Sequence, residues 1–311
     1  MKPTSSSVDL PIRQGLTLAY RLSLAVATLM AVTSIAGIAF GLAGLYRPDP
    51  RLAISVTEAE AGLLLPGLLG QDVFNLVVGL PVLLGAIWLA HRGSLFALLL
   101  WPGALLYSLY WGVIYLVGSP FGVLFLLYVP LVTLSAYATI AVVSSIDGEE
   151  VRRRLGATVP ARLVGGTLVA LALLTLGQDA TGAFITAIGD NVPVDPAARP
   201  VWISDLAIEV PAVLVGGALL WLRRPLGYVA GAGLLLQYGL TPVGLAASMA
   251  LASILTGSPL DLPTVIVLLV FGVVCFTPLA FFVRGVRAAG PRSAVSTTVK
   301  RKEQRHEGVR R

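Results

Sequence analysis

The stretch QDVFNLVVGLPVLLGAIWLAHRGS, from Gln71 to Ser94, contains the pattern that decides the fold. An apolar run fills its middle, a carboxylate and an amide lie near its start, and a tryptophan and basic residues lie near its end. A run of this length predicts a helix that crosses the ~30 Å hydrocarbon core of a bilayer. The acid near its head, Asp72, is unusual in such a helix and needs an explanation.

The rest of the chain has the same apolar character. Of its 311 residues, 56% are hydrophobic and 12% are charged, whereas about 25% are charged in an average soluble protein. The apolar runs are long and unbroken, which excludes an outer-membrane barrel. The sequence therefore predicts an all-α, polytopic helical membrane protein with about eight transmembrane helices. We expect these helices at Leu22–Leu45, Asp72–Leu89, Leu95–Val117, Gly122–Val143, Leu163–Ile188, Asp205–Leu222, Leu226–Met249 and Leu262–Val283.

An even number of spans puts both termini on one side of the membrane, and the basic residues gather on that side. Nineteen Lys and Arg residues fall there, and three fall on the other side. Under the positive-inside rule, this asymmetry predicts a multi-pass plasma-membrane protein with cytoplasmic termini. The excess of Arg over Lys, together with abundant Ala, Leu and Gly, indicates a prokaryotic source.

The acidic residues have the opposite preference, because nine of them fall on or near the predicted outer face. These are Asp49, Glu58, Glu60, Asp72, Asp190, Asp195, Asp205, Glu209 and Asp261. Acidic residues contribute little to topology, so their placement is separate information. One interpretation is a set of solvated acidic loops, and the other is a polar site open to the outside.

Several kinds of chemistry are excluded by missing residues. The single cysteine, Cys275, excludes a disulfide within the chain, and neither histidine lies inside a predicted helix, where a haem would need it. No Walker, HExxH or GxSxG motif is present. We therefore expect no cofactor and no zinc site, although carboxylates alone can bind a hard cation or relay protons. The basic tail has no interleaved aromatic residues, so we expect no nucleic-acid partner.

Two segments of the chain resemble each other, which predicts an internal repeat. DVFNLVVGLPVLLGAIWL (Asp72–Leu89) and DLAIEVPAVLVGGALLWL (Asp205–Leu222) both begin with Asp, contain a proline and end in Trp-Leu before basic residues. The next hairpins also match, as GSPFG and GSPLD. Both segments run in the same direction, so we expect two parallel four-helix halves; the alternative is chance similarity between Leu- and Ala-rich helices.

This repeat divides the chain into five parts. We expect a cytoplasmic N-terminal segment at 1–18, a first membrane half at 19–143, a charged cytoplasmic linker at 144–162, a second membrane half at 163–284 and a disordered basic tail at 285–311. The expected partners are the lipid bilayer, anionic lipid headgroups at the basic tail, and an unidentified small ligand.

The candidate ligand-binding residues are polar or aromatic groups in the predicted helices. They are Asp72, Asn75, Asp179, Asp205 and Glu209, with Tyr107 and Trp111 as walls. Sixteen residues separate each of Asp72 and Asp205 from a tryptophan that fits the inner interface, which is roughly 24 Å of helix. This places both aspartates at the outer boundary of the hydrocarbon core. The alternative, purely structural role for each is that of a helix N-terminal cap.

Asp179 is the most informative of these residues. It lies about two-thirds of the way across the predicted fifth helix, where an ionisable group marks a functional site by default. The alternative is that this helix ends near Leu176 and that Asp179 lies in a loop. Polar and aromatic residues of the predicted third and seventh helices could complete such a site. Residues of this kind more often serve helix packing or lie at the lipid interface. The residues concerned are the stripe Tyr107, Trp111 and Tyr115 with Tyr110 at its edge, and Gln237, Tyr238 and Thr241.

Three functions are compatible with these features. The leading hypothesis is binding or transport of a small solute or cation through an outward-facing acidic site between the halves. The second is a cell-envelope enzyme that acts on a lipid-linked substrate, with a carboxylate as general base. The third is a non-catalytic membrane scaffold. The inner halves of the predicted helices are almost wholly apolar, which counts against a continuous polar path, and the absence of catalytic motifs favours a protein that is not an enzyme.

Overall fold

A computed structural model describes residues 10–13, 15–42, 58–119, 122–189 and 198–289, and for residues 58–65 it describes the backbone only. This part of the chain is helical and contains one isolated β-bridge. The elements are α1 (Thr17–Leu42), α2 (Glu58–Phe74), η1 (Asn75–Gly79), α3 (Leu80–His91), α4 (Leu95–Gly118), α5 (Phe125–Ser145), α6 (Gly148–Leu155), α7 (Ala161–Ile188), α8 (Ala198–Ser204), η2 (Asp205–Glu209), α9 (Val210–Trp221), α10 (Pro225–Thr256) and α11 (Leu262–Ala288). The two elements named η are π-helical.

These elements make eight helices that are long and apolar enough to cross a membrane. Six are single α-helices. The second span, Pro66–His91, joins α2, η1 and α3, and the sixth span, Ala198–Trp221, joins α8, η2 and α9. Large apolar side chains such as Ile266, Val270 and Val273 are more than half exposed, as expected where lipid is the solvent. The chain is a multi-pass helical membrane protein, as its composition predicts.

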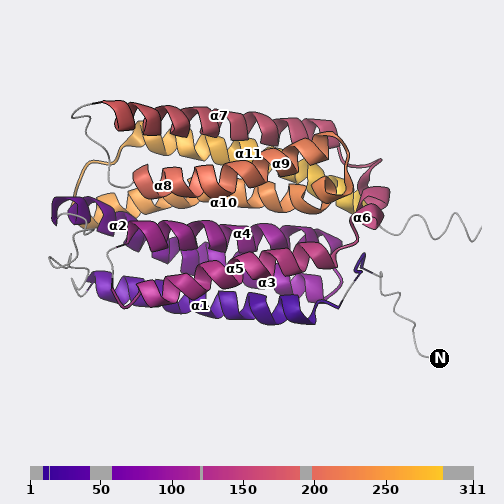
Figure 1. Ribbon diagram of the computed structural model, residues 1–311, viewed down its shortest axis with the longest axis horizontal. Coiled ribbons are helices and arrows are strands. Elements are labelled where there is room, and N and C mark those ends of the chain that lie inside the picture. The colour runs from indigo at the N-terminus through magenta and orange to yellow at the C-terminus, as the bar shows by residue number, and fades with distance from the viewer. Residues whose placement is uncertain (1–9, 14, 43–57, 120–121, 190–197, 290–311) are drawn as a thin grey trace, which may run out of the picture.

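The spans lie side by side in one bundle, with the helices of the first half below those of the second half in Figure 1. α4 and α10 pack against each other where the halves meet, and α2 also packs against α10. α4 is the most enclosed of the eight spans. In its most apolar 18-residue stretch 78% of the residues are buried, against 22% in the corresponding stretch of α7. Polar side chains on α4 are therefore held away from both lipid and water.

α4 and α10 meet through glycine. A Cβ atom on Gly103 would stand 2.0 Å from the carbonyl oxygen of Gly233, and a Cβ atom on Gly233 would stand 2.7 Å from the backbone nitrogen of Gly103. Any larger residue would push the helices apart, so the halves touch backbone to backbone at this point.

Each π-helical segment lies just before a proline. Pro81 and Pro211 have no N–H to donate to the carbonyl four residues earlier, and their rings crowd that carbonyl. In both spans the turn before the proline is widened, with a backbone N–H bonded five residues back to the carbonyl of Asn75 or Asp205. Such π-turns are rare and occur frequently at functional sites.

The helix boundaries correct several expectations. The second helix begins at Glu58 and the sixth span at Ala198, so neither starts at an aspartate. The short apolar run before Asp72 extends the second helix. α7 continues to Ile188, so it does not end near Leu176. Residues 285–288 belong to α11 rather than to a disordered tail, and residues 290–311 lie outside the described part of the chain.

The linker between the halves is folded. α6 is an eight-residue helix whose N-cap, Asp147, accepts hydrogen bonds from the next backbone N–H groups. Ile12 of the N-terminal segment forms an antiparallel bridge with Ile146, and Arg13 forms an ion pair of 3.1 Å with Asp147. These contacts tie the start of the chain to the linker, at the end of the bundle where α6 lies (Figure 1).

Candidate functional site

All seven predicted site residues are buried, and they belong to two separate clusters rather than to one. Their exposed fractions run from 1% for Asp72 and Tyr107 to 6% for Trp111, Asp179 and Asp205. The first cluster contains Asp72, Asn75 and Tyr107. The second contains the other three acids. Trp111 lies on α4 close to both.

The first cluster, which we name the amide–tyrosine cluster, joins α2, η1 and α4 by hydrogen bonds between side chains. Tyr107 donates its hydroxyl hydrogen to Asn75 Oδ1 at 2.8 Å, and Gln71 Nε2 donates to the Tyr107 hydroxyl at 2.8 Å and to Asn75 Oδ1 at 2.9 Å. Asn75 Nδ2 donates to the Tyr115 hydroxyl at 3.2 Å, and Tyr115 donates to Asp72 Oδ1 at 2.8 Å. One acid is therefore held by neutral groups.

This cluster also reaches two further helices. Ser248 of α10 donates to Gln71 Oε1 at 3.0 Å, which links the cluster to the second half. On the other side, Asp72 lies against α1, close to Ser34, and a Cβ on Gly37 would stand 2.1 Å from Asp72 Oδ2. The amide–tyrosine cluster thus fastens the second span to its neighbours.

The second cluster, which we name the acidic cluster, lies between α7, η2 and α10. Asp205 is its centre, since its carboxyl group lies close enough to interact with those of both Asp179 and Glu209. Gln237 Nε2 donates to Glu209 Oε1, and the Thr241 hydroxyl lies 3.4 Å from the same oxygen. The three acids form a chain of carboxyl groups.

Tyr110 and Trp111 connect this chain to α4. The Tyr110 hydroxyl lies close enough to the Asp205 carboxyl group to interact with it. Its ring lies 5.7 Å from that of Trp111 and perpendicular to it, and the Trp111 ring is 6.4 Å from that of Tyr107. The face of α4 therefore presents Tyr107 to the amide–tyrosine cluster and Tyr110 to the acidic cluster, with Trp111 between them.

The acidic cluster has no cation beside it in the described part of the chain. The ion pairs there involve Asp147, Glu149 and Glu150, which lie around α6 outside the spans. Asp179 Oδ2 and Asp205 Oδ1 are buried without a hydrogen-bond partner. Neighbouring buried carboxyl groups repel one another when they are all ionised, so this arrangement favours a proton shared within the cluster.

The capping interpretation of the two aspartates is wrong. Asp72 lies 14 residues after the start of α2, and Asp205 lies seven residues after the start of α8. Neither side chain caps the helical segment that it adjoins. The loop interpretation of Asp179 is also wrong, because this residue is inside α7 and 6% exposed.

The acids are not arranged as a multidentate metal site. Within the described residues, no group of three or more His, Cys, Asp or Glu side chains is placed to hold one. Asp205 lies between the other two acids, so the three carboxyl groups do not surround one point. A chain of carboxyl groups is instead suited to passing a proton or binding a small monovalent cation.

The sequence interpretation missed several residues of both clusters. Gln71 and Ser248 were not recognised, although Gln71 lies four residues before Asn75 and thus on the same helix face. Tyr110, Gln237 and Thr241 were noted as polar residues in apolar helices but were not assigned to a partner, because sequence periodicity does not reveal which helices face one another.

Comparisons of this chain with protein-family models, with curated proteins and with solved structures give no match.

Proposed function

We propose that this membrane protein binds and moves a small cation, with the proton as the simplest case, through the acidic cluster. The observation that carries the proposal is the buried chain Asp179–Asp205–Glu209, in which Asp205 interacts with both neighbours and no basic side chain of the described residues pairs with them. Uncompensated carboxyl groups inside a membrane are costly and usually functional.

The cluster would work by exchanging the proton that its carboxyl groups share. When one site loses its proton, repulsion between neighbouring carboxylates favours rebinding of a proton or capture of another small cation. Gln237 and Thr241 would stabilise the ionised form of Glu209, because both present hydrogen-bond donors to it. Coupled movement of a small solute is the broader form of the same proposal.

The enzyme alternative receives less support from this geometry. A carboxylate that acts on a lipid-linked substrate needs to face a groove open to lipid, whereas Asp205 and Glu209 are 6% and 3% exposed. We also propose that the end of the bundle with α6 faces the cytoplasm of a prokaryotic cell, because the basic residues gather at that end.

The proposal includes an internal repeat, but with a register different from the one that the Asp and Trp-Leu motifs favour. Those motifs pair Asp72 with Asp205. The π-helical segments begin at Asn75 and Asp205 and are followed by Pro81 and Pro211, a spacing of 130 in both cases. The residues with positive φ beyond α3 and α9, Gly93 and Arg223, have the same spacing.

The contact between α4 and α10 supports this register. Gly103 and Gly233 are also 130 residues apart, and they touch each other. A residue that meets its own counterpart lies on the two-fold axis that relates two copies. At this register Asn75 is the counterpart of Asp205, and Asp72 has an apolar counterpart, Trp202.

The test is cation movement in liposomes that contain the full-length protein and a pH-sensitive dye. With an imposed pH gradient and a potassium ionophore, wild-type protein should speed internal pH change. Glu209→Gln should reduce the protein-dependent rate by about 100-fold, since this is the scale of losing a proton-transfer group. Asp261→Asn is the matched control, because Asp261 caps α11 outside the cluster and Asn retains capping.

Two outcomes would overturn the proposal. A Glu209→Gln protein as active as wild type would remove the acidic cluster from the transport path. An inactive wild-type protein would contradict proton movement, and replacing the pH gradient with gradients of Na⁺ or K⁺ tests the wider cation proposal. If cells still need the protein but tolerate changes at Asp179 and Glu209, the scaffold function is favoured instead.

A further inference from the structure

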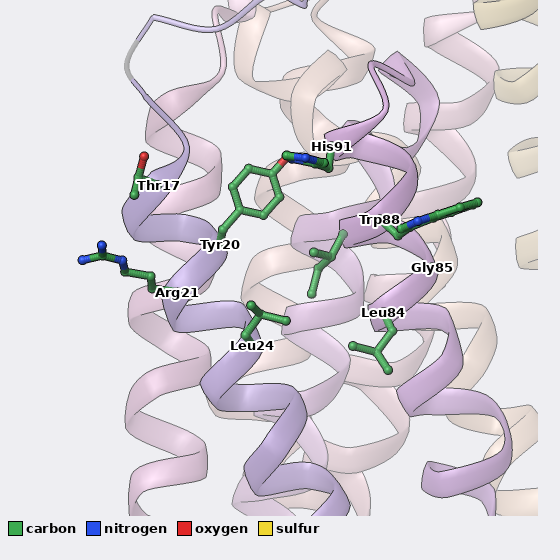
Figure 2. A pocket seen from close by; sticks show the side chains of 9 residues that line it. Thr17, Tyr20, Arg21, Leu24, Leu84, Gly85, Trp88 and His91 are labelled. Carbon is green, nitrogen blue, oxygen red and sulfur yellow. The ribbon is translucent and has the colours of Figure 1, made fainter.

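A groove on the outside of the bundle lies away from both clusters. It has a volume of about 820 Å³ and runs between α1 and α3, near the end that carries α6. Figure 2 shows Thr17, Tyr20 and His91 near one end, with Leu24 and Leu84 further along. The polarity of the groove therefore changes along the helix axis.

The groove surface is mostly apolar, and its few polar residues lie at the mouth. These are Thr17, Tyr20, Arg21 and His91, with the Arg21 guanidinium on the side of α1 away from α3 in Figure 2, and no lining residue is acidic. The Arg92 guanidinium lies 3.8 Å from the centre of the Trp88 ring, which forms part of the wall. These groups suit a phosphate, because Arg, His and hydroxyl side chains all donate hydrogen bonds to its oxygens.

The body of the groove is apolar and open. Leu24, Leu84 and Trp88 are 51%, 41% and 53% exposed. Gly85 also lines the groove, and a Cβ on it would meet no atom within 4 Å. The space beside Gly85 is therefore available to a molecule that lies along the two helices.

We propose that this groove binds an anionic glycerophospholipid, with one acyl chain along Leu24 and Leu84 and the phosphate at the basic mouth. A membrane lipid is the occupant because the groove faces outward from two membrane spans. Its chemistry also changes from cationic to apolar in the same order as a phospholipid changes from headgroup to tail. The site is independent of the acidic cluster.

The test is native mass spectrometry of the full-length protein in detergent, titrated with phosphatidylglycerol or with phosphatidylcholine of identical acyl chains. Wild-type protein should bind its first phosphatidylglycerol more tightly than later ones and more tightly than phosphatidylcholine. Gly85→Phe fills the groove and should abolish that first tight step. Arg21→Gln should weaken it about five-fold, the scale expected for one basic residue near an anionic lipid.

Two matched controls separate this site from general lipid contact. Gly67→Phe adds the same ring to the other end of the span, where a Cβ also meets no atom. Arg287→Gln removes an exposed charge from α11. Neither should change the first binding step, and inorganic phosphate should not displace the lipid.

The contrary results are equally clear. If both lipids bind alike, or if Arg21→Gln binds as wild type does, only annular lipid contact exists and the site is overturned. Equal losses with Gly85→Phe and Gly67→Phe would overturn it as well. Size-exclusion chromatography checks that Gly85→Phe is folded, and Arg21→Gln decides the question if it is not.

Discussion

The amide–tyrosine cluster and the acidic cluster occupy corresponding places in the two halves at the proposed register, but they treat charge in opposite ways. In the first half Gly79 makes room for the ring of Tyr107, since a Cβ on Gly79 would stand 2.8 Å from it. In the second half the corresponding positions hold Glu209 and Gln237, which are bonded to each other. One half fills this space with a ring, and the other fills it with an acid.

The difference suggests different roles for the two clusters: the first stabilises helix packing, and the second is the proposed cation site. The amide–tyrosine cluster gives its single acid neutral partners from neighbouring helices, so it stabilises helix packing. Both clusters contain a buried carboxyl oxygen without a hydrogen-bond partner, Asp72 Oδ2 in the first and Asp179 Oδ2 and Asp205 Oδ1 in the second. Only the acidic cluster brings several carboxyl groups together, which costs stability and, under the proposed function, provides the place where a cation binds. Variants that convert one kind of cluster into the other test this distinction directly.

The largest effect is expected when the second half receives the residues of the first. Glu209→Gly combined with Gln237→Tyr should lower cation flux in liposomes by about 100-fold. Glu209→Gly alone should lose flux and also stability, because it leaves a cavity. The added tyrosine should restore thermal stability but not flux; a double variant that keeps flux, or that is no more stable than Glu209→Gly, would break the comparison.

A smaller effect is expected at the tyrosine that holds Asp72. Tyr115→Phe removes the donor to Asp72 Oδ1 and the acceptor for Asn75 Nδ2, so the free energy of unfolding should fall by about 1–3 kcal/mol. Reversible unfolding in mixed micelles measures this. Tyr137→Phe is the control, because Tyr137 is 60% exposed on the bundle surface, and a loss no greater than the control's would show that the cluster is not a structural fastener.

A still smaller effect, of opposite sign, is expected in the acidic cluster. Asp205→Asn removes the central carboxyl and its repulsion with Asp179 and Glu209, so it should raise the free energy of unfolding by about 1 kcal/mol while lowering flux. Asp72→Asn should instead lower stability, since it replaces one acceptor oxygen with a donor group. Unfolding in mixed micelles measures both variants. If the free energy of unfolding changes equally in Asp205→Asn and Asp72→Asn, the two clusters do not differ in the way proposed.

The smallest effect is expected at Asp147, an exposed acid outside the spans that serves as a reference for both clusters. Slight desolvation raises its pKa, but the backbone N–H groups of Glu150 and Glu149 and the Arg13 guanidinium outweigh this, so its pKa lies below the usual range. A lowered folded-state pKa stabilises the protein above about pH 4 and ceases to do so as the pH falls further. Protection of α6 from hydrogen exchange should therefore weaken with acid in the wild type and change less in Asp147→Asn.

The sequence predicts the eight spans well because long apolar runs have one stable solution in lipid, a helix with all backbone groups bonded internally. It leaves Asp179 between a membrane helix and a loop, because the polar residues Gln178 and Thr181 beside it interrupt the apolar run. It misplaces Asp205, because the segment before it, ARPVWIS, is short and mixed in polarity. In the structure this segment is the helix α8, which packs against α4.

The division of the candidate residues into two clusters was not predictable from composition or spacing. Asp72 and Asp205 have similar sequence surroundings, yet a three-residue change of register puts them in different environments. The π-turns mark this register, because they begin at Asn75 and Asp205 and not at the two similar aspartates. A periodicity of 3.6 residues cannot represent such a turn.

The contact of Ile12 and Arg13 with the linker has a consequence for the order of synthesis. Ile12 and Arg13 are synthesised before the first span, but their partners, Ile146 and Asp147, are synthesised only after the fourth. These contacts cannot form until the first four spans have been made and the two segments lie on the same side of the membrane. Their formation therefore follows complete insertion of the first half.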